Sequence, residues 1–113
     1  MSDSNTPEKW RVDPWIPMSK PIDLKHLGKL QEELGESCAA VARCIIQGID
    51  ELEPITRKCN RQWLEEELAD VMANIELVIH HFKLNFDEIN LRKLKKMQNL
   101  QRWHLMSDHI PPT

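Results

Sequence analysis

Apolar residues recur every three or four positions over residues 22–47 and form a wide apolar surface over residues 61–83, which predicts two helices. We expect a third helix, rich in Lys and Arg, over residues 85–103. Gly48 is a suitable stop for the first helix. Asn85 followed by Glu88 has the spacing of a capping box at the start of the third. With only three Gly, two Phe and no Tyr, the composition also favours helices, so we expect an all-α helical bundle.

The second predicted helix is apolar on nearly every side in its second half. A helix of that kind is normally buried on most sides. Three helices of a 113-residue chain cannot easily provide this cover. We therefore predict a homo-oligomer, either a dimer or a dimer-of-dimers tetramer, with this helix in the shared core. Its apolar residues are Leu64, Leu68, Val71, Met72, Ile75, Val78, Ile79 and Phe82.

The chain divides into an arm, a helical domain and a tail. Residues 1–21 hold four of the seven Pro, which disfavour a helix. This arm also carries Trp10 and Trp15, which a disordered segment would rarely contain, so we expect it to pack against the helical bundle or a neighbouring subunit. Residues 22–104 form the helical domain, and residues 105–113 form an irregular tail.

Charge and cysteine content narrow the class of protein. The net charge is −3, which argues against a sequence-independent nucleic-acid binder. The three Cys lack the spacing of a disulfide framework, and Cys38 and Cys44 fit small buried hydrophobes of a helix. We see neither a signal peptide nor the roughly 18 apolar residues of a membrane span. We therefore expect a cytoplasmic protein without a membrane partner.

Acidic pairs occupy the first two predicted helices. Glu33 and Glu36 are three residues apart, as are Glu67 and Asp70, so each pair shares one helix face. Both pairs border an apolar stripe. Four carboxylates meeting there would repel one another unless a hard cation lay among them, and Mg²⁺ prefers such oxygen ligands. Mn²⁺ is an alternative occupant. The residues alone are equally compatible with solvated helix surfaces.

A family resemblance bears on this choice. EELGE at residues 32–36, followed by ELAD at residues 67–70, resembles the EExxE…ExxD signature of the MazG-like nucleoside triphosphate pyrophosphohydrolases. The chain looks like a compact single-domain member of the kind carried by phages and mobile elements. The resemblance implies a four-helix-bundle core completed by oligomerisation. It also implies hydrolysis of a nucleoside triphosphate, for which we expect a dNTP, between the α and β phosphates.

The resemblance assigns roles to the acidic residues. Glu33, Glu36, Glu67 and Asp70 match the family's metal ligands. A carboxylate that does not bind metal would take the proton of the attacking water, and Glu32 or Glu66 would orient that water. Which Glu is the base stays open.

Residues near the acidic pairs are candidates for substrate contact. Lys29 lies one turn before Glu33 and His26 two turns before it, so both are placed to meet phosphate, or sugar in the case of His26. Lys29 is equally suited to an ordinary salt bridge with Glu33. Asn74 lies one turn after Asp70, on the turn that faces the nucleoside in the family.

The third helix and the arm offer further substrate contacts. Lys95, Asn99 and Arg102 share one helix face and match the family's K…N..R pattern, which reaches phosphates; without the resemblance they form a solvated basic face. Trp10 and Trp15 are suited to stacking on a base or to pinning the arm to the bundle or to a neighbouring subunit.

Two other functions deserve comparison with the enzyme. A di-iron bundle needs Glu-x-x-His on its helices, but Leu77 and Val78 precede His80 and His81 by three residues, so we discount it. A non-catalytic helical interaction module, such as an antitoxin or adaptor, would need no metal. It remains the alternative to the hydrolase.

Overall fold

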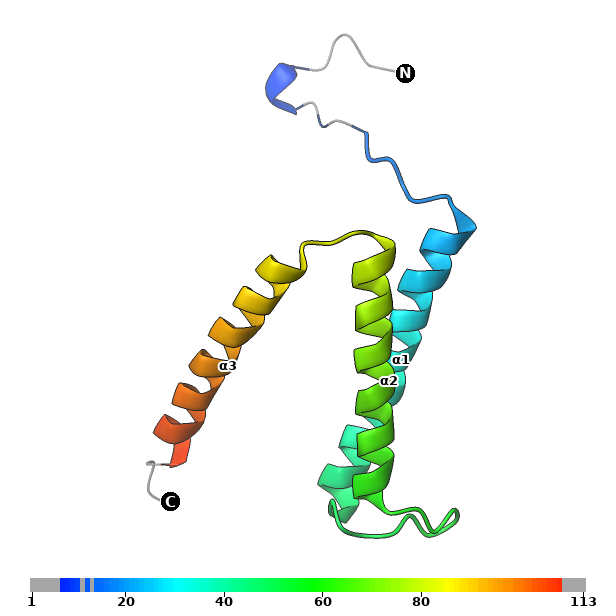
Figure 1. Cartoon of the computed structure of the whole chain (residues 1–113), viewed down its shortest axis with the longest axis vertical. Helices are drawn as coiled ribbons and strands as arrows, with labels where there is room; N and C mark the ends of the chain where they lie inside the picture. Colours follow the sequence, from blue (N-terminus) through cyan, green and yellow to red (C-terminus); the bar gives the residue numbers. More distant parts are fainter. Residues whose placement is uncertain (1–6, 11, 13, 109–113) are drawn as a thin grey trace.

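Two long helices pack against each other as an antiparallel hairpin and hold the core of the chain (Figure 1). The computed structural model describes residues 7–10, 12 and 14–108. Over these residues a short 3-10 turn, η1 (Glu8–Trp10), precedes α1 (Pro21–Gln47), α2 (Asn60–His81) and α3 (Phe86–Asp108). The predicted all-α class is confirmed, although α3 continues five residues beyond its expected end at Trp103.

The start and end of α1 follow from local backbone chemistry. Pro21 lies in the first turn, where its missing N–H costs no helical hydrogen bond. Gly48 adopts a φ of 105°, and its N–H donates to the Cys44 carbonyl at 3.0 Å. That conformation favours glycine and ends the helix as predicted.

The connection between α1 and α2 is held by polar contacts around Asn60, which is completely buried. The Asn60 Nδ2 donates to the Gln47 Oε1 at 3.2 Å and to the Gly48 carbonyl at 3.0 Å. Arg61 reinforces the same end of the hairpin, because its Nε donates to the Asp50 Oδ1 at 2.7 Å. These bonds fix how α2 starts beside the end of α1.

The chain leaves α2 through a Schellman motif. Lys83 adopts a left-handed conformation with a φ of 51°. Its N–H donates to the His80 carbonyl at 3.3 Å, and the Leu84 N–H donates to the Ile79 carbonyl at 3.0 Å. The next residue, Asn85, then caps α3, because its Oδ1 accepts the Glu88 N–H at 3.1 Å as predicted.

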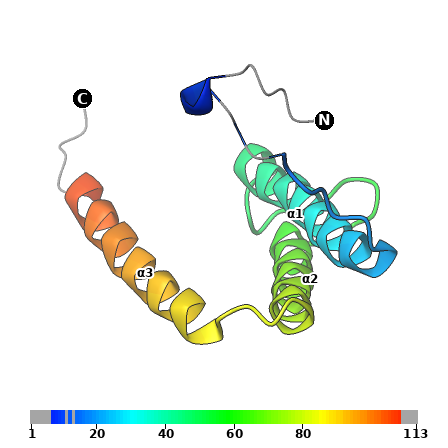
Figure 2. The same cartoon turned by 90° about the horizontal axis from the view of Figure 1, so that it is seen from above.

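Helix α3 stands apart from the α1–α2 hairpin in both views of the fold (Figures 1 and 2). None of the described residues of α3 is buried. The radius of gyration is 21.1 Å, against about 13 Å for a compact domain of this length. A single copy therefore does not form a closed bundle.

Burial within one copy is limited. Helix α2 is not covered on most sides, since Leu68, Met72 and Leu77 are exposed, as expected of a single chain with three helices. Cys38 is exposed because it lies off the contact with α2, so its expected burial is wrong, whereas Cys44 is half-buried with its Sγ 3.8 Å from the Asn60 carbonyl oxygen. Trp10 and Trp15 of the arm are exposed as well, so the arm does not pack on its own hairpin.

No helix among the described residues is long and apolar enough to cross a membrane.

Candidate metal and nucleotide site

Three of the predicted carboxylates converge where α1 and α2 pack. Glu33 of α1 and Glu67 and Asp70 of α2 each offer a carboxylate oxygen, and these oxygens all lie within 4.8 Å of one another. Glu33 is buried, Glu67 half-buried and Asp70 exposed. The cluster therefore runs from the helix interface to the surface, which would let a ligand reach it from solvent.

Two of these carboxylates carry oxygens without a hydrogen-bond partner. The Oε2 atoms of Glu33 and Glu67 are both buried and unpaired. The other oxygens are satisfied: Lys29 Nζ lies 3.2 Å from the Glu33 Oε1, and the Trp63 Nε1 donates to the Glu67 Oε1 at 3.1 Å. An unpaired buried carboxylate oxygen is costly, and a hard divalent cation with oxygen ligands would remove that cost. The donor set therefore fits Mg²⁺.

Glu36, the fourth predicted ligand, flanks the cluster instead of joining it. The negative charge of Glu33 raises the pKa of Glu36, with smaller contributions from burial, Glu32 and Glu67. Like charges crowd this site, and Lys29 only partly offsets them. Crowding of like charges is common at sites that bind a cation or transfer a proton.

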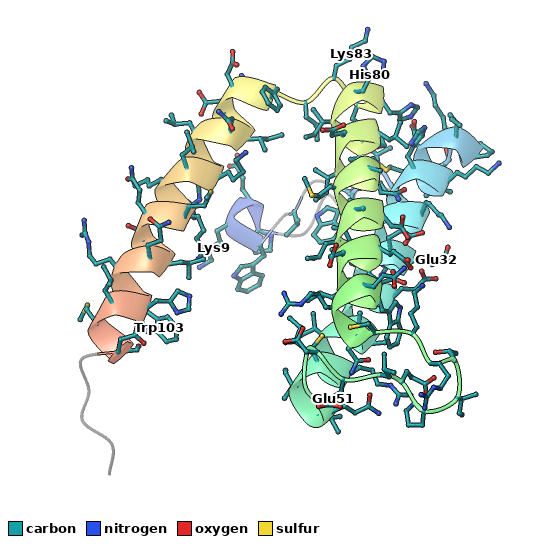
Figure 3. The ribbon with its side chains drawn as sticks, turned by 60° about the horizontal axis from the view of Figure 1, so that its bottom comes forward. Lys9, Glu32, Glu51, His80, Lys83 and Trp103 are labelled. Carbon is teal, nitrogen blue, oxygen red and sulfur yellow. The ribbon has the colours of Figure 1, made fainter. Side chains whose placement is uncertain are left out.

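Glu32 and Glu66, the candidates for orienting water, differ in their surroundings. Glu32 lies at the surface of α1 (Figure 3), and its Oε1 is 3.5 Å from the Lys29 Nζ. Glu66 instead forms an ion pair with Lys58, which lowers the pKa of Glu66. Both carboxylates thus have a lysine partner, but Glu32 also lies close enough to Glu36 to raise the pKa of Glu36, which places it nearer the cluster.

The structure brings together three of the predicted substrate residues. His26, Lys29 and Asn74 line one cavity of about 280 Å³ beside the carboxylate cluster. The Asn74 Nδ2 donates to the Asp70 carbonyl at 2.8 Å, which ties it to the turn that carries the cluster. Ile22, Lys25 and Leu77 complete the lining.

Sequence reasoning missed a polar clamp at the same end of the hairpin. The His81 ring nitrogen Nε2 lies 2.7 Å from the Asp23 Oδ1, and the His81 ring stacks on His26 with centroids 4.1 Å apart. This clamp holds the His26 ring at the edge of the cavity. No local sequence pattern predicts this contact, because Asp23 and His81 come together only through the pairing of α1 with α2.

Other predicted contacts are not assembled in a single copy. Lys95, Asn99 and Arg102 lie on α3, which does not pack on the hairpin; Figure 3 shows Trp103 of α3 far from Glu32. Trp10 and Trp15 are exposed. None of these five substrate candidates is therefore placed at the carboxylate cluster by the fold of one chain.

A second cavity, of about 450 Å³, lies at the closed end of the hairpin. The buried Glu53 carboxylate borders it, and hydrogen bonds from Thr56 and Ile55 lower the pKa of Glu53. Trp63 lines this cavity, and its Nε1 donates a hydrogen bond to the Glu67 Oε1 of the cluster, so the cavity and the cluster are neighbours. Arg43, Ile55, Thr56 and Lys58 form the rest of the lining. This cavity was not predicted, because the apolar residues of the connection have no regular spacing.

Comparisons with protein-family models, with curated proteins and with solved structures found no match to this chain.

Proposed function

We propose that this chain is a Mg²⁺-dependent nucleoside triphosphate pyrophosphohydrolase of the MazG-like kind. It would cleave a nucleotide, for preference a dNTP, between the α and β phosphates and so clear unwanted nucleotides from the pool. The observation that carries the proposal is the convergence of Glu33, Glu67 and Asp70 around two buried, unpaired carboxylate oxygens. The same residues belong to the EELGE segment at residues 32–36 and the ELAD segment at residues 67–70, whose resemblance to the family signature also supports it.

Glu33, Glu67 and Asp70 would hold the metal ion, with Glu36 beside them as the fourth ligand or as the proton acceptor. When bound, Mg²⁺ would neutralise phosphate charge and acidify a water molecule. A raised pKa makes Glu36 a better acceptor for the proton of the attacking water. Glu32, which lies at the adjacent surface, would orient that water.

The cavity beside the cluster would receive the nucleotide. Lys29 already lies against Glu33 and would move to a phosphate oxygen when the metal ion offsets the carboxylate charge. His26 and Asn74 line the same cavity and would contact the sugar, the base or a phosphate. Lys95, Asn99 and Arg102 would reach phosphates only in an assembly that brings α3 to a hairpin. Trp10 or Trp15 would stack on a base only if the arm folds over the carboxylate cluster.

Carboxylate variants of the whole protein test this proposal. Pyrophosphate release is measured for each NTP and dNTP with Mg²⁺, using Glu36→Gln, Asp70→Asn and Glu65→Gln. Glu65 belongs to the same acidic run but is not part of the cluster, so its variant is the matched control. We expect release to fall at least about 100-fold in the first two variants and to persist in the control. No release with any nucleotide would favour a non-catalytic interaction module.

A further inference from the structure

Trp63 is shared by the carboxylate cluster and by the cavity at the closed end of the hairpin, which we call the closed-end cavity. The indole lines this cavity of about 450 Å³, and its Nε1 donates to the Glu67 Oε1 at 3.1 Å. A volume of this size is typical of small-molecule sites. A flat group that entered the cavity would stack on the indole and so lie next to a carboxylate of the cluster.

A fixed carboxylate borders the closed-end cavity. The Oε2 of the buried Glu53 accepts the Ile55 N–H at 3.0 Å, the Thr56 N–H at 2.5 Å and the Thr56 hydroxyl at 2.7 Å. These bonds, chiefly those from Thr56, lower the pKa of Glu53, so its carboxylate is ionised at neutral pH. The Oε1 accepts no hydrogen bond from the residues that the structure describes, and it is therefore available to a donor of a ligand.

Arg43 adds a donor to this acceptor. It lines the closed-end cavity, and its positive charge is a further cause, after the Thr56 hydrogen bonds, of the lowered pKa of Glu53. A carboxylate accepts from the amino group of a nucleobase, and a guanidinium donates to a ring nitrogen or carbonyl oxygen. The Trp63 indole offers a flat surface on which any base can stack. Thymine and uracil present a carbonyl oxygen where cytosine presents its amino group, and the Glu53 carboxylate would repel that oxygen.

The cavity on the other side of the cluster, which we call the open-end cavity, has a different charge. Lys25, His26 and Lys29 line it, and its described lining contains no Asp or Glu. At the closed end, the charge of Arg43 is balanced by Glu53, and the other lining cation already forms an ion pair. A chain of phosphates carries several negative charges and would therefore be drawn to the open-end cavity rather than toward Glu53.

From these contacts we propose that the closed-end cavity binds the base of a nucleotide and prefers a base that carries an amino group. The triphosphate would extend from that base across the carboxylate cluster to Lys25 and Lys29. The path of the triphosphate rests on the proposed hydrolase activity, whereas the base site depends only on the cavity. Because the Trp63 indole would contact the base and also holds Glu67, the fit of the base would influence the position of a metal ligand.

Titration with nucleosides, which have no phosphate and need no Mg²⁺, tests the base site separately from hydrolysis. The indole N–H signal of Trp63, identified by its loss in Trp63→Phe, is followed by NMR as the full chain is titrated with deoxycytidine or thymidine. We expect deoxycytidine to shift this signal and to bind about tenfold more tightly than thymidine.

Glu53→Gln should remove this preference. The three donors on Oε2 would keep the amide oxygen in place, so the amide nitrogen would meet the amino group of cytosine. Glu51→Gln makes the same change at an exposed position of the same connection (Figure 3) and should keep the preference. A loss of folding would instead lower the melting temperature and disturb the signals of all four Trp.

Inorganic tripolyphosphate with Mg²⁺ tests the other end of the site. Lys25→Gln should weaken its binding about threefold and leave deoxycytidine binding unchanged, while Glu53→Gln should leave tripolyphosphate binding unchanged. Tripolyphosphate binding that responds to Glu53→Gln but not to Lys25→Gln would reverse the direction of the nucleotide and overturn the inference.

Two results of the nucleoside titration would also overturn the inference. One is deoxycytidine that leaves the Trp63 signal unchanged or shifts the ring signals of His26 instead. The other is a preference over thymidine that Glu53→Gln does not alter. If the titration agrees with the prediction while no nucleotide is cleaved, the base site stands and the hydrolase proposal fails. If dNTPs are cleaved but nucleosides do not reach Trp63, the hydrolase proposal stands and the base site fails.

Discussion

At the scale of single residues, the clearest feature is that the Glu36 carboxylate lies close to other negatively charged carboxylates. The neighbouring Glu33, Glu32 and Glu67 raise the pKa of Glu36. A raised pKa means that the folded chain holds the proton more tightly than the unfolded chain, so this group lowers stability as the pH rises through the range between the two values. Glu36→Gln should therefore raise the melting temperature near pH 7 without Mg²⁺, and change little at a pH below both values.

Adding Mg²⁺ should reverse that ranking. The wild-type chain should gain melting temperature because the ion binds only the folded state, while Glu36→Gln should gain less. Glu65→Gln, outside the cluster, is the control and should respond to Mg²⁺ like the wild type. Equal responses in all three chains would mean that the cluster does not bind the ion.

Asn60 provides the second prediction at this scale. Replacing it by Ala removes two hydrogen bonds in a fully buried place and leaves the Gly48 carbonyl with the Glu51 N–H, at 3.3 Å, as its remaining donor. We expect a loss of about 2 kcal/mol in the free energy of unfolding, measured as a lower denaturant midpoint at an unchanged slope. Gln31→Ala, at an exposed position of α1, should change the midpoint very little. A similar small change in Asn60→Ala would show that the connection does not depend on this side chain.

At the scale of the elements, the pattern of apolar residues identified α1 and α2, because a regular spacing of apolar residues can be read without knowledge of the fold. The capping residues and the basic composition identified α3. Local capping chemistry was equally readable, as Gly48 and Asn85 show. The connection at residues 48–59 was not, since its contacts join residues such as Asp50 and Arg61 that no local pattern relates. The same limit hid the Asp23–His81 clamp.

Helix α3 should depend on its N-cap more than a packed helix would, because none of its described residues is buried. Asn85→Ala removes the acceptor for the Glu88 N–H and should cost about 1 kcal/mol. The expected result is faster amide exchange in the first turn of α3. Asn90→Ala, inside the same helix, should instead raise its helical content. Unchanged exchange at residues 86–88 would show that the cap is not what orders this helix.

At the scale of the whole molecule, the sequence indicated an acidic site and an incomplete bundle, and the fold explains both. Three of four predicted ligands meet because α1 and α2 are antiparallel and each carries an acidic pair near its middle. The roles of Lys95, Asn99 and Arg102 could not be judged from spacing alone. They depend on where α3 lies, which one chain does not determine by packing.

We propose that the carboxylate cluster supports cleavage of a nucleotide between its α and β phosphates. Phosphorus NMR on a dNTP incubated with the protein and Mg²⁺ would report the products directly. We predict that the three triphosphate signals give way to a nucleoside monophosphate and pyrophosphate, and that a chelator stops the change. A nucleoside diphosphate with free phosphate, or an intact nucleotide after prolonged incubation with every dNTP and NTP, would contradict this proposed activity.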